Sequence, residues 1–279
     1  MALRELAIHA STAFHSKTSQ STLGQGGSNE FLDHIFQAIR DPQPIVRACA
    51  ADALSQCLKI LVERHHPSLT GLLCQVYFSL LEGLEQEPAK KRPWATIART
   101  EAIQHGSLLV TSCMLAYTRD FMLPRFDEVC KNVLAFSDNP RPLIKLEVVR
   151  LVPRLARRCP GVFGRRYLEQ GLEFLIESAR SPPPVKGGVD IRPTAFRAIG
   201  ELVLAMTDKN SGLVIGGVKL PTVKITDDPD NPQGGLSVKL SDSGVIYDKL
   251  PDIFGLVRTG LKSGPASGTS GWHRRTPYW

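Results

Sequence analysis

Three short segments contain residue types that can bind ions or phosphate groups. His65 and His66 are adjacent imidazoles, 212–217 is glycine-rich, and 227–231 is rich in carboxylates. Segment 212–217 lacks the Gly-Lys-Ser/Thr ending of a phosphate loop, and 227–231 lacks the glycine and closing glutamate of a calcium loop. The two histidines fall at an expected helix end, where imidazole can cap carbonyl oxygens. Motifs of serine hydrolases, zinc proteases and protein kinases do not occur. We therefore predict no catalytic residue, cofactor or metal site in this chain.

A group of arginines is the remaining candidate for binding. Residues 140–200 contain twelve Lys/Arg and five Asp/Glu, which equals the net charge of +7 for the whole chain. Such a patch is either a solvated helix face or a surface that attracts an acidic protein or nucleic acid. No aromatic residues interleave with the arginines, so we expect no nucleic-acid partner. The first four share one face of an expected helix and the last two are expected to start the next: Arg150, Arg154, Arg157, Arg158, Arg165 and Arg166.

A motif repeated along the chain predicts the elements that position these arginines. Four copies begin with an apolar residue before a cation, at Arg47, Arg99, Lys145 and Arg192, spaced 52, 46 and 47 residues apart. This period is close to the roughly 40–47 residues of a HEAT-type helix pair. We expect each cation to lie just outside the buried face and to pair with an acid near the preceding turn, such as Asp41 or Asp138. Apolar residues, most of them small or β-branched, follow on one helical face, where small residues let helices approach closely: Ala50, Ala53, Leu54, Val148 and Ala195.

Between these motifs, apolar residues recur every three to four positions and predict further amphipathic helices. One pair cannot bury its apolar stripe alone, so neighbouring pairs must cover it. The expected fold is all-α, an α-solenoid of HEAT-type helical hairpins (an armadillo-like superhelix) with about four and a half pairs. It begins with a lone helix near residues 2–10 and ends with another near 247–261. Both ends lack polar capping repeats, so we expect a fragment of a longer protein.

The segments without periodicity divide the chain. We expect a solenoid over 1–207 with a flexible insertion at 15–29, and a terminal HEAT helix at 244–262. Between them, 208–243 is expected to form either a small β-hairpin or a disordered insertion, and 263–279 a disordered tail. No transmembrane run or signal peptide is expected. The six cysteines, without CxxC spacing, are expected to be reduced core residues of a cytosolic protein, and His105 is expected to be packed.

Several motifs in the same order resemble the N-terminal HEAT region of the target-of-rapamycin (TOR) kinases, within the PI3K-related kinase family. They are Ala2-Leu3-Arg4-Glu5-Leu6-Ala7, Arg40-Asp41-Pro42 leading to Val46-Arg47, His105-Gly106-Ser107-Leu108-Leu109, Arg125-Phe126-Asp127-Glu128-Val129-Cys130, Leu151-Val152-Pro153-Arg154-Leu155-Ala156, Tyr167-Leu168 and Ala195-Phe196-Arg197-Ala198-Ile199-Gly200. The resemblance covers about residues 1–206 and the helix at 247–261. The insertions at 15–29 and 208–243 and the tail depart from it.

The resemblance implies a non-catalytic scaffold segment of a serine/threonine protein kinase in growth and nutrient signalling. ATP and Mg would belong to the family's downstream kinase domain, which this chain lacks. It implies protein partners (a Raptor-like subunit, a small GTPase and the rest of the TOR chain), a dimeric complex, and a cytoplasmic location, including endomembrane surfaces. The alternative is a stand-alone HEAT-repeat adaptor.

Overall fold

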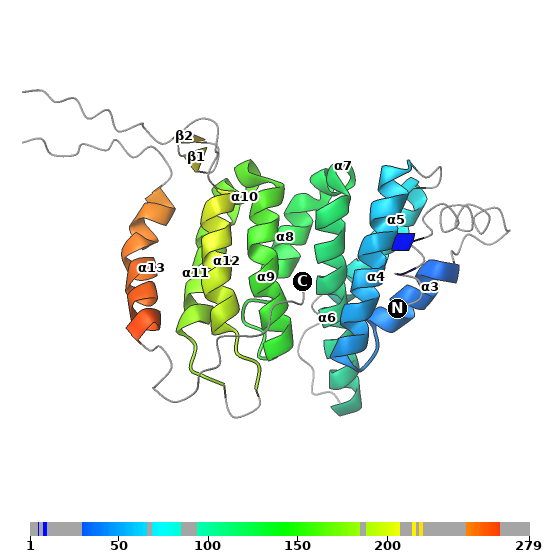
Figure 1. Ribbon diagram of the computed structural model, residues 1–279, viewed down its shortest axis with the longest axis horizontal. Coiled ribbons are helices and arrows are strands. Elements are labelled where there is room, and N and C mark those ends of the chain that lie inside the picture. The colour runs from blue at the N-terminus through cyan, green and yellow to red at the C-terminus, as the bar shows by residue number, and fades with distance from the viewer. Residues whose placement is uncertain are drawn as a thin grey trace, which may run out of the picture.

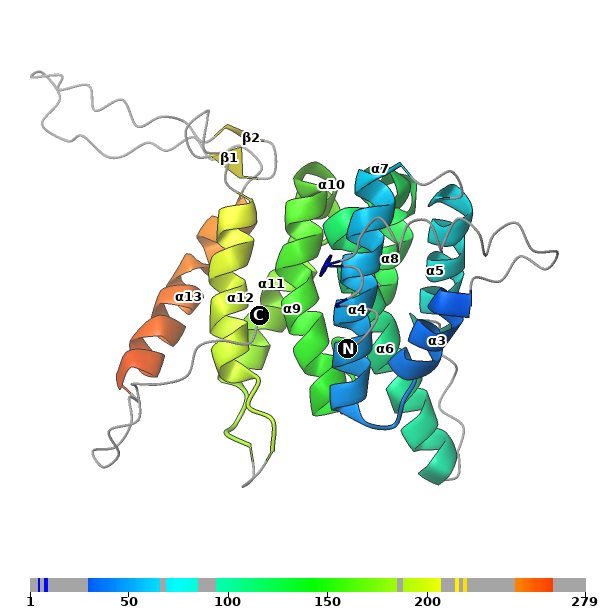
Figure 2. The same cartoon turned by 45° about the vertical axis from the view of Figure 1, so that its right-hand side comes forward.

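The computed structural model describes residues 5, 8–9, 30–65, 69–84, 94–184, 188–206, 214–215, 218–219 and 244–262. Its helices form one stack that runs from α3 at one end to α13 at the other (Figures 1 and 2). They are α3 (Glu30–Ile39), α4 (Pro44–Glu63), α5 (Leu69–Leu84), α6 (Trp94–Tyr117), α7 (Arg119–Met122), the 3-10 turn η1 (Leu123–Arg125), α8 (Phe126–Leu134), α9 (Pro142–Arg158), α10 (Pro160–Arg166), α11 (Leu168–Arg180), α12 (Arg192–Ala205) and α13 (Gly244–Lys262).

The helices form four consecutive pairs, and the second helix of every pair carries one of the four predicted motifs. The pairs are α3 with α4, α5 with α6, α7–α8 with α9, and α10–α11 with α12. Each second helix packs on the next, α4 on α6, α6 on α9 and α9 on α12. One apolar core therefore runs from Ile35 to Ile246 without a break. The predicted all-α solenoid is confirmed.

Proline and loop geometry set where the second helices begin. Pro44, Pro142 and Pro193 occupy the first or second position of α4, α9 and α12. Proline suits this position because its fixed φ is helical and the missing N–H would have no partner there. Ahead of α4, the Asp41 side chain accepts a hydrogen bond from the backbone N–H of Gln43. Ahead of α9, the Asn139 side chain accepts one from the backbone N–H of Arg141. The local sequence therefore specifies the same turn in the first and third pairs.

The layer of first helices is tied together by polar side chains. Arg40, after α3, pairs with Glu82 on α5 at 2.5 Å, and the Tyr77 hydroxyl on α5 donates to Glu128 on α8 at 2.6 Å. Exposed ion pairs contribute at most about 1 kcal/mol each. The apolar contacts of the second helices therefore supply most of the cohesion.

The first repeat cation differs from its prediction, because Arg47 is buried rather than at the edge of the packed face. It is 2% exposed. Its Nη1 donates to the backbone carbonyls of Asp41 and Pro42 at 2.7 and 2.9 Å, and its Nε donates to His105 Nδ1 on α6 at 3.0 Å. A buried guanidinium is tolerated only when its donors are satisfied, and here turn carbonyls accept instead of the Asp41 carboxylate. Arg47 thus joins the first pair's turn to the second pair.

The other motif positions vary in their surroundings. Arg99 is exposed and Lys145 is half-buried, with its Nζ 5.9 Å from the centroid of the Phe174 ring. Arg192 pairs with the carboxylate of Asp190 at 2.8 Å, in the turn before α12. The predicted cation–acid pairing is therefore observed at this copy. The packing positions are all buried: Ala50, Ala53, Leu54, Val148 and Ala195.

Several predicted segments lie outside the described residues. These are the insertion at 15–29, the tail at 263–279 and most of 208–243. Within the last, β1 (Val214–Ile215) and β2 (Val218–Lys219) form an antiparallel pair, with Ile215 opposite Val218. The residues between them in sequence, Gly216 and Gly217, are typical of two-residue hairpin turns. Of the helix expected near 2–10, only residues 5, 8 and 9 are described, and they are helical.

The apolar stripe predicted for α13 is only partly covered. α13 packs chiefly on α11, and ion pairs from Lys249 to Glu173 and from Arg180 to Asp252 fasten this contact. Phe254 is 67% and Val257 43% exposed. In the described part of the chain, no second helix covers that side of α13.

The close approach of α6 to α3 at Gly106 can be tested by substitution. A β-carbon added there would lie 2.7 Å from Ile39 Cγ2, and nearer still to the Ile39 carbonyl oxygen. We expect Gly106→Ala to reduce the free energy of unfolding by about 1–3 kcal/mol, because backbone must move. Gly200→Ala is the control, since nothing lies within 4 Å of its added β-carbon. It should stabilise α12 by about 0.5–1 kcal/mol. Equal urea midpoints for the two variants would contradict the close approach.

The contact between Arg47 and His105 predicts a pH dependence of stability. Burial, followed by the charges of Arg47 and Arg150, lowers the pKa of His105 from 6.5 to about 4. The unfolded chain therefore takes up the proton first as pH falls, so stability is lost between pH 6.5 and 4. The loss is about 3 kcal/mol, at 1.36 kcal/mol per pKa unit.

We expect His105→Gln to flatten this dependence, because the amide oxygen can still accept from Arg47 Nε but takes up no proton. Urea unfolding at a series of pH values measures it. His34→Gln, at an exposed position on α3, is the control and should behave as the wild type. Identical slopes for His105→Gln and wild type would show that His105 does not remain neutral in the fold.

Candidate interaction surface

The arginines of α9 lie on the helix side opposite its core-facing residues. Ile144, Val148, Leu151, Val152 and Leu155 are each fully buried. Their spacing directs one side of α9 into the stack and leaves the other at the surface. Arg150, Arg154 and Arg157 are exposed and Arg158 is half-buried. These four residues are called the α9 arginine face below.

Arg150 is committed to a partner on its own helix. Its Nη1 lies 2.5 Å from Glu147 Oε1, and the Glu147 side chain is only 8% exposed. Burial raises the pKa of Glu147, and the charge of Arg150 opposes that rise. Removing Arg150 would leave a buried carboxylate unpaired, which is strongly destabilising. Arg150 therefore has a structural role in the fold, and this role comes before any contact with a partner protein.

The next arginines reach neighbouring helices. Arg154 donates from Nη1 to the hydroxyl of Ser112 on α6, and Arg157 lies 3.8 Å from Glu201 on α12. Glu201 is also engaged by Arg197 at 2.8 Å. The contact of Arg157 is long and its acid is shared, so its charge is only partly balanced.

Arg165 and Arg166 do not belong to the same face. The prediction that they start the next helix is wrong, because they end a separate helix, α10, and α11 begins at Leu168. Arg166 pairs with Asp127 on α8 at 2.6 Å, and the Tyr167 hydroxyl also donates to Asp127 at 2.9 Å. Tyr167 and then Arg166 lower the pKa of Asp127. This pair therefore lies in the layer of first helices.

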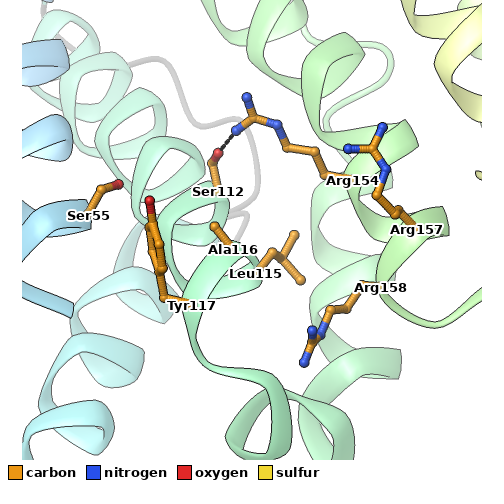
Figure 3. A pocket seen from close by; sticks show the side chains of 8 residues that line it. All are labelled: Ser55, Ser112, Leu115, Ala116, Tyr117, Arg154, Arg157 and Arg158. Atoms are coloured by element: carbon orange, nitrogen blue, oxygen red, sulfur yellow. Dashed lines mark hydrogen bonds between the residues drawn. The ribbon is translucent and has the colours of Figure 1, made fainter. Parts of the chain in front are cut away.

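A hollow of about 440 Å³ opens beside the α9 arginine face, lined by α4, α6 and α9. Figure 3 shows Arg154, Arg157 and Arg158 on one side of it, with Ser112 and Leu115 across from them. Its lining residues are Ser55, Ser112, Leu115, Ala116, Tyr117, Arg154, Arg157 and Arg158. The sequence predicted the arginines but not the polar residues opposite, which lie about 40–100 positions earlier on other helices.

The other residues considered for chemistry have structural roles in the described part of the chain. His65 follows α4 with a left-handed φ of 49°, and its N–H donates to the Val62 carbonyl oxygen. His105 is buried, as predicted. All six cysteines are free. Among the described residues, no three His, Cys, Asp or Glu side chains gather in a way that could hold a metal. Segment 227–231 and most of 212–217 lie outside those residues.

No described helix is long and apolar enough to cross a membrane. No family model matches the chain, and no solved structure does.

Curated proteins do match the chain. It is 30% identical over 204 residues to the serine/threonine-protein kinase TOR of Arabidopsis thaliana, which covers 73% of this chain. The TOR kinase of Oryza sativa subsp. japonica is 29% identical over 204 residues, and tor1 of Schizosaccharomyces pombe is 24% identical over 180 residues. The chain spans about 7% of the length of these relatives. It is therefore a homologue of a non-kinase segment of the TOR serine/threonine-protein kinases.

Proposed function

We propose that this chain is a non-catalytic scaffold segment of a TOR-type kinase and holds protein partners in a TOR complex. The observation that carries the proposal is the homology to a small part of these kinases, in a region that forms an uninterrupted helix stack. A stack of helix pairs presents a long surface relative to the size of the apolar core that it buries. Such solenoids commonly bind other proteins.

The α9 arginine face is the proposed contact for an acidic partner. Arg154 and Arg157 are exposed and project from the layer of second helices. Long, charged side chains at a rim steer an oppositely charged partner and fix its orientation. A Raptor-like subunit and a small GTPase are the partners that we propose, in the cytoplasm and at endomembrane surfaces, with the assembled complex dimeric. Kinase activity, with ATP and Mg, would belong to a kinase domain outside these residues.

Reversing the charge of this face tests the proposal. We choose Arg154→Glu with Arg157→Glu and leave Arg150 intact, because Glu147 depends on it. The tagged chain is precipitated from source cells, and the Raptor-like subunit and small GTPases that accompany it are quantified. Recovery of at least one should fall about tenfold, since placing like charges against each other costs several kcal/mol and 1.4 kcal/mol is already tenfold.

The matched control reverses Lys131 and Arg165, two exposed cations on α8 and α10. It changes the net charge equally and should keep the recovery of the wild type. Melting curves of both double variants establish that they fold. A folded Arg154→Glu/Arg157→Glu variant with undiminished recovery of both partners would refute this face as the contact.

A further inference from the structure

Among the described residues, the polar lining of the hollow beside α9 consists of cations and hydroxyls and includes no carboxylate. Arg154, Arg157 and Arg158 contribute guanidinium groups, and Ser55, Ser112 and Tyr117 contribute hydroxyls. We propose that it is a binding site for a small phosphate-bearing anion. The proposal concerns a ligand of the chain itself and does not depend on the scaffold role.

The spacing of the three arginines concentrates positive charge. They occupy positions i, i+3 and i+4 of α9, so their side chains emerge as neighbours on the helix surface. Like charges at this spacing destabilise a helix unless something balances them. A bound anion would remove that repulsion.

Two acids near the arginines already pair with other cations. Glu147 is taken by Arg150 at 2.5 Å, and Glu201 lies 3.8 Å from Arg157 while pairing with Arg197 at 2.8 Å. Neither Glu147 nor Glu201 is among the described residues that line the hollow.

The donors suit phosphate in geometry. A guanidinium presents parallel N–H groups that match two phosphate oxygens, and an isolated ammonium does not. Arg154 is held in place by donating to Ser112 Oγ (Figure 3). Ser112 accepts in that bond, so its own hydrogen remains to be donated to an anion.

The shape of the hollow favours a small solute over a lipid surface. Its 440 Å³ lies within the roughly 300–1,000 Å³ of small-molecule sites. It is recessed between α4, α6 and α9, with Leu115 and Ala116 from α6 in its lining. A flat bilayer would meet the exposed rim only, whereas a compact anion can enter the hollow.

Calorimetric titration of the 279-residue chain with inorganic pyrophosphate, at constant ionic strength, tests the proposal. We expect wild type to bind at one site, and Arg154→Gln/Arg157→Gln/Arg158→Gln to weaken binding at least about tenfold, since charge-assisted bonds are lost. The control Lys131→Gln/Arg165→Gln/Arg258→Gln removes three exposed cations elsewhere and should bind as wild type. Equal weakening in both triple variants would show only a general charge effect and overturn the site.

Two further variants keep the test sound if the triple variant is unstable. Ser112→Ala retains every charge and should weaken binding severalfold, while Arg154→Lys should also weaken it because the fork is lost. Failure of wild type to bind pyrophosphate would refute the proposal.

Flotation with phosphatidic acid vesicles, against phosphatidylcholine vesicles, separates the two sources of phosphate. We expect no arginine-dependent flotation. Binding to phosphatidic acid vesicles without pyrophosphate binding would assign the arginines to a lipid surface instead.

Discussion

The structure depends on continuous contact between the second helices α4, α6, α9 and α12. α6 and α9 each pack against a second helix on either side, and α4 and α12 against one, so removing one pair would expose the core of the next. First helices also approach the second helix α6 closely, at positions where a glycine has no side chain. Gly83 lies against Ser107 and Ile103 of α6, and Gly106 lies against Ile39 of α3. Stability is thereby shared along the stack, as in other repeat proteins.

Charged groups inside this layer are retained where a nearby group compensates them. Arg47 is buried, yet its donors reach two turn carbonyls and an imidazole on the following pair. Glu147 is buried beside Arg150. In both cases a charge at the core boundary is compensated locally. On α9 the same helix then presents further arginines to the surface, which connects the packing of the stack to its candidate binding face.

The sequence predicted the fold because periodicity is local information. The motif copies at Arg47, Arg99, Lys145 and Arg192 fall on the four second helices, and the small residues after them are buried. The burial of Arg47 was not predictable, since it depends on His105, 58 positions away. Nor was the separate helix α10, because Tyr167 interrupts an otherwise helical pattern. The hollow was not predictable either, because Ser55, Ser112 and Arg154 are far apart in sequence and meet only through helix stacking.

The central claim is that this chain works as part of a TOR-type kinase and not as a separate protein. Precipitation from source cells with an antibody against residues 30–200, followed by sizing and a kinase assay of the precipitate, tests it most directly. We expect a polypeptide many times heavier than 30.6 kDa with associated protein kinase activity. A band at 30.6 kDa without kinase activity would contradict it and indicate a free-standing HEAT-repeat adaptor.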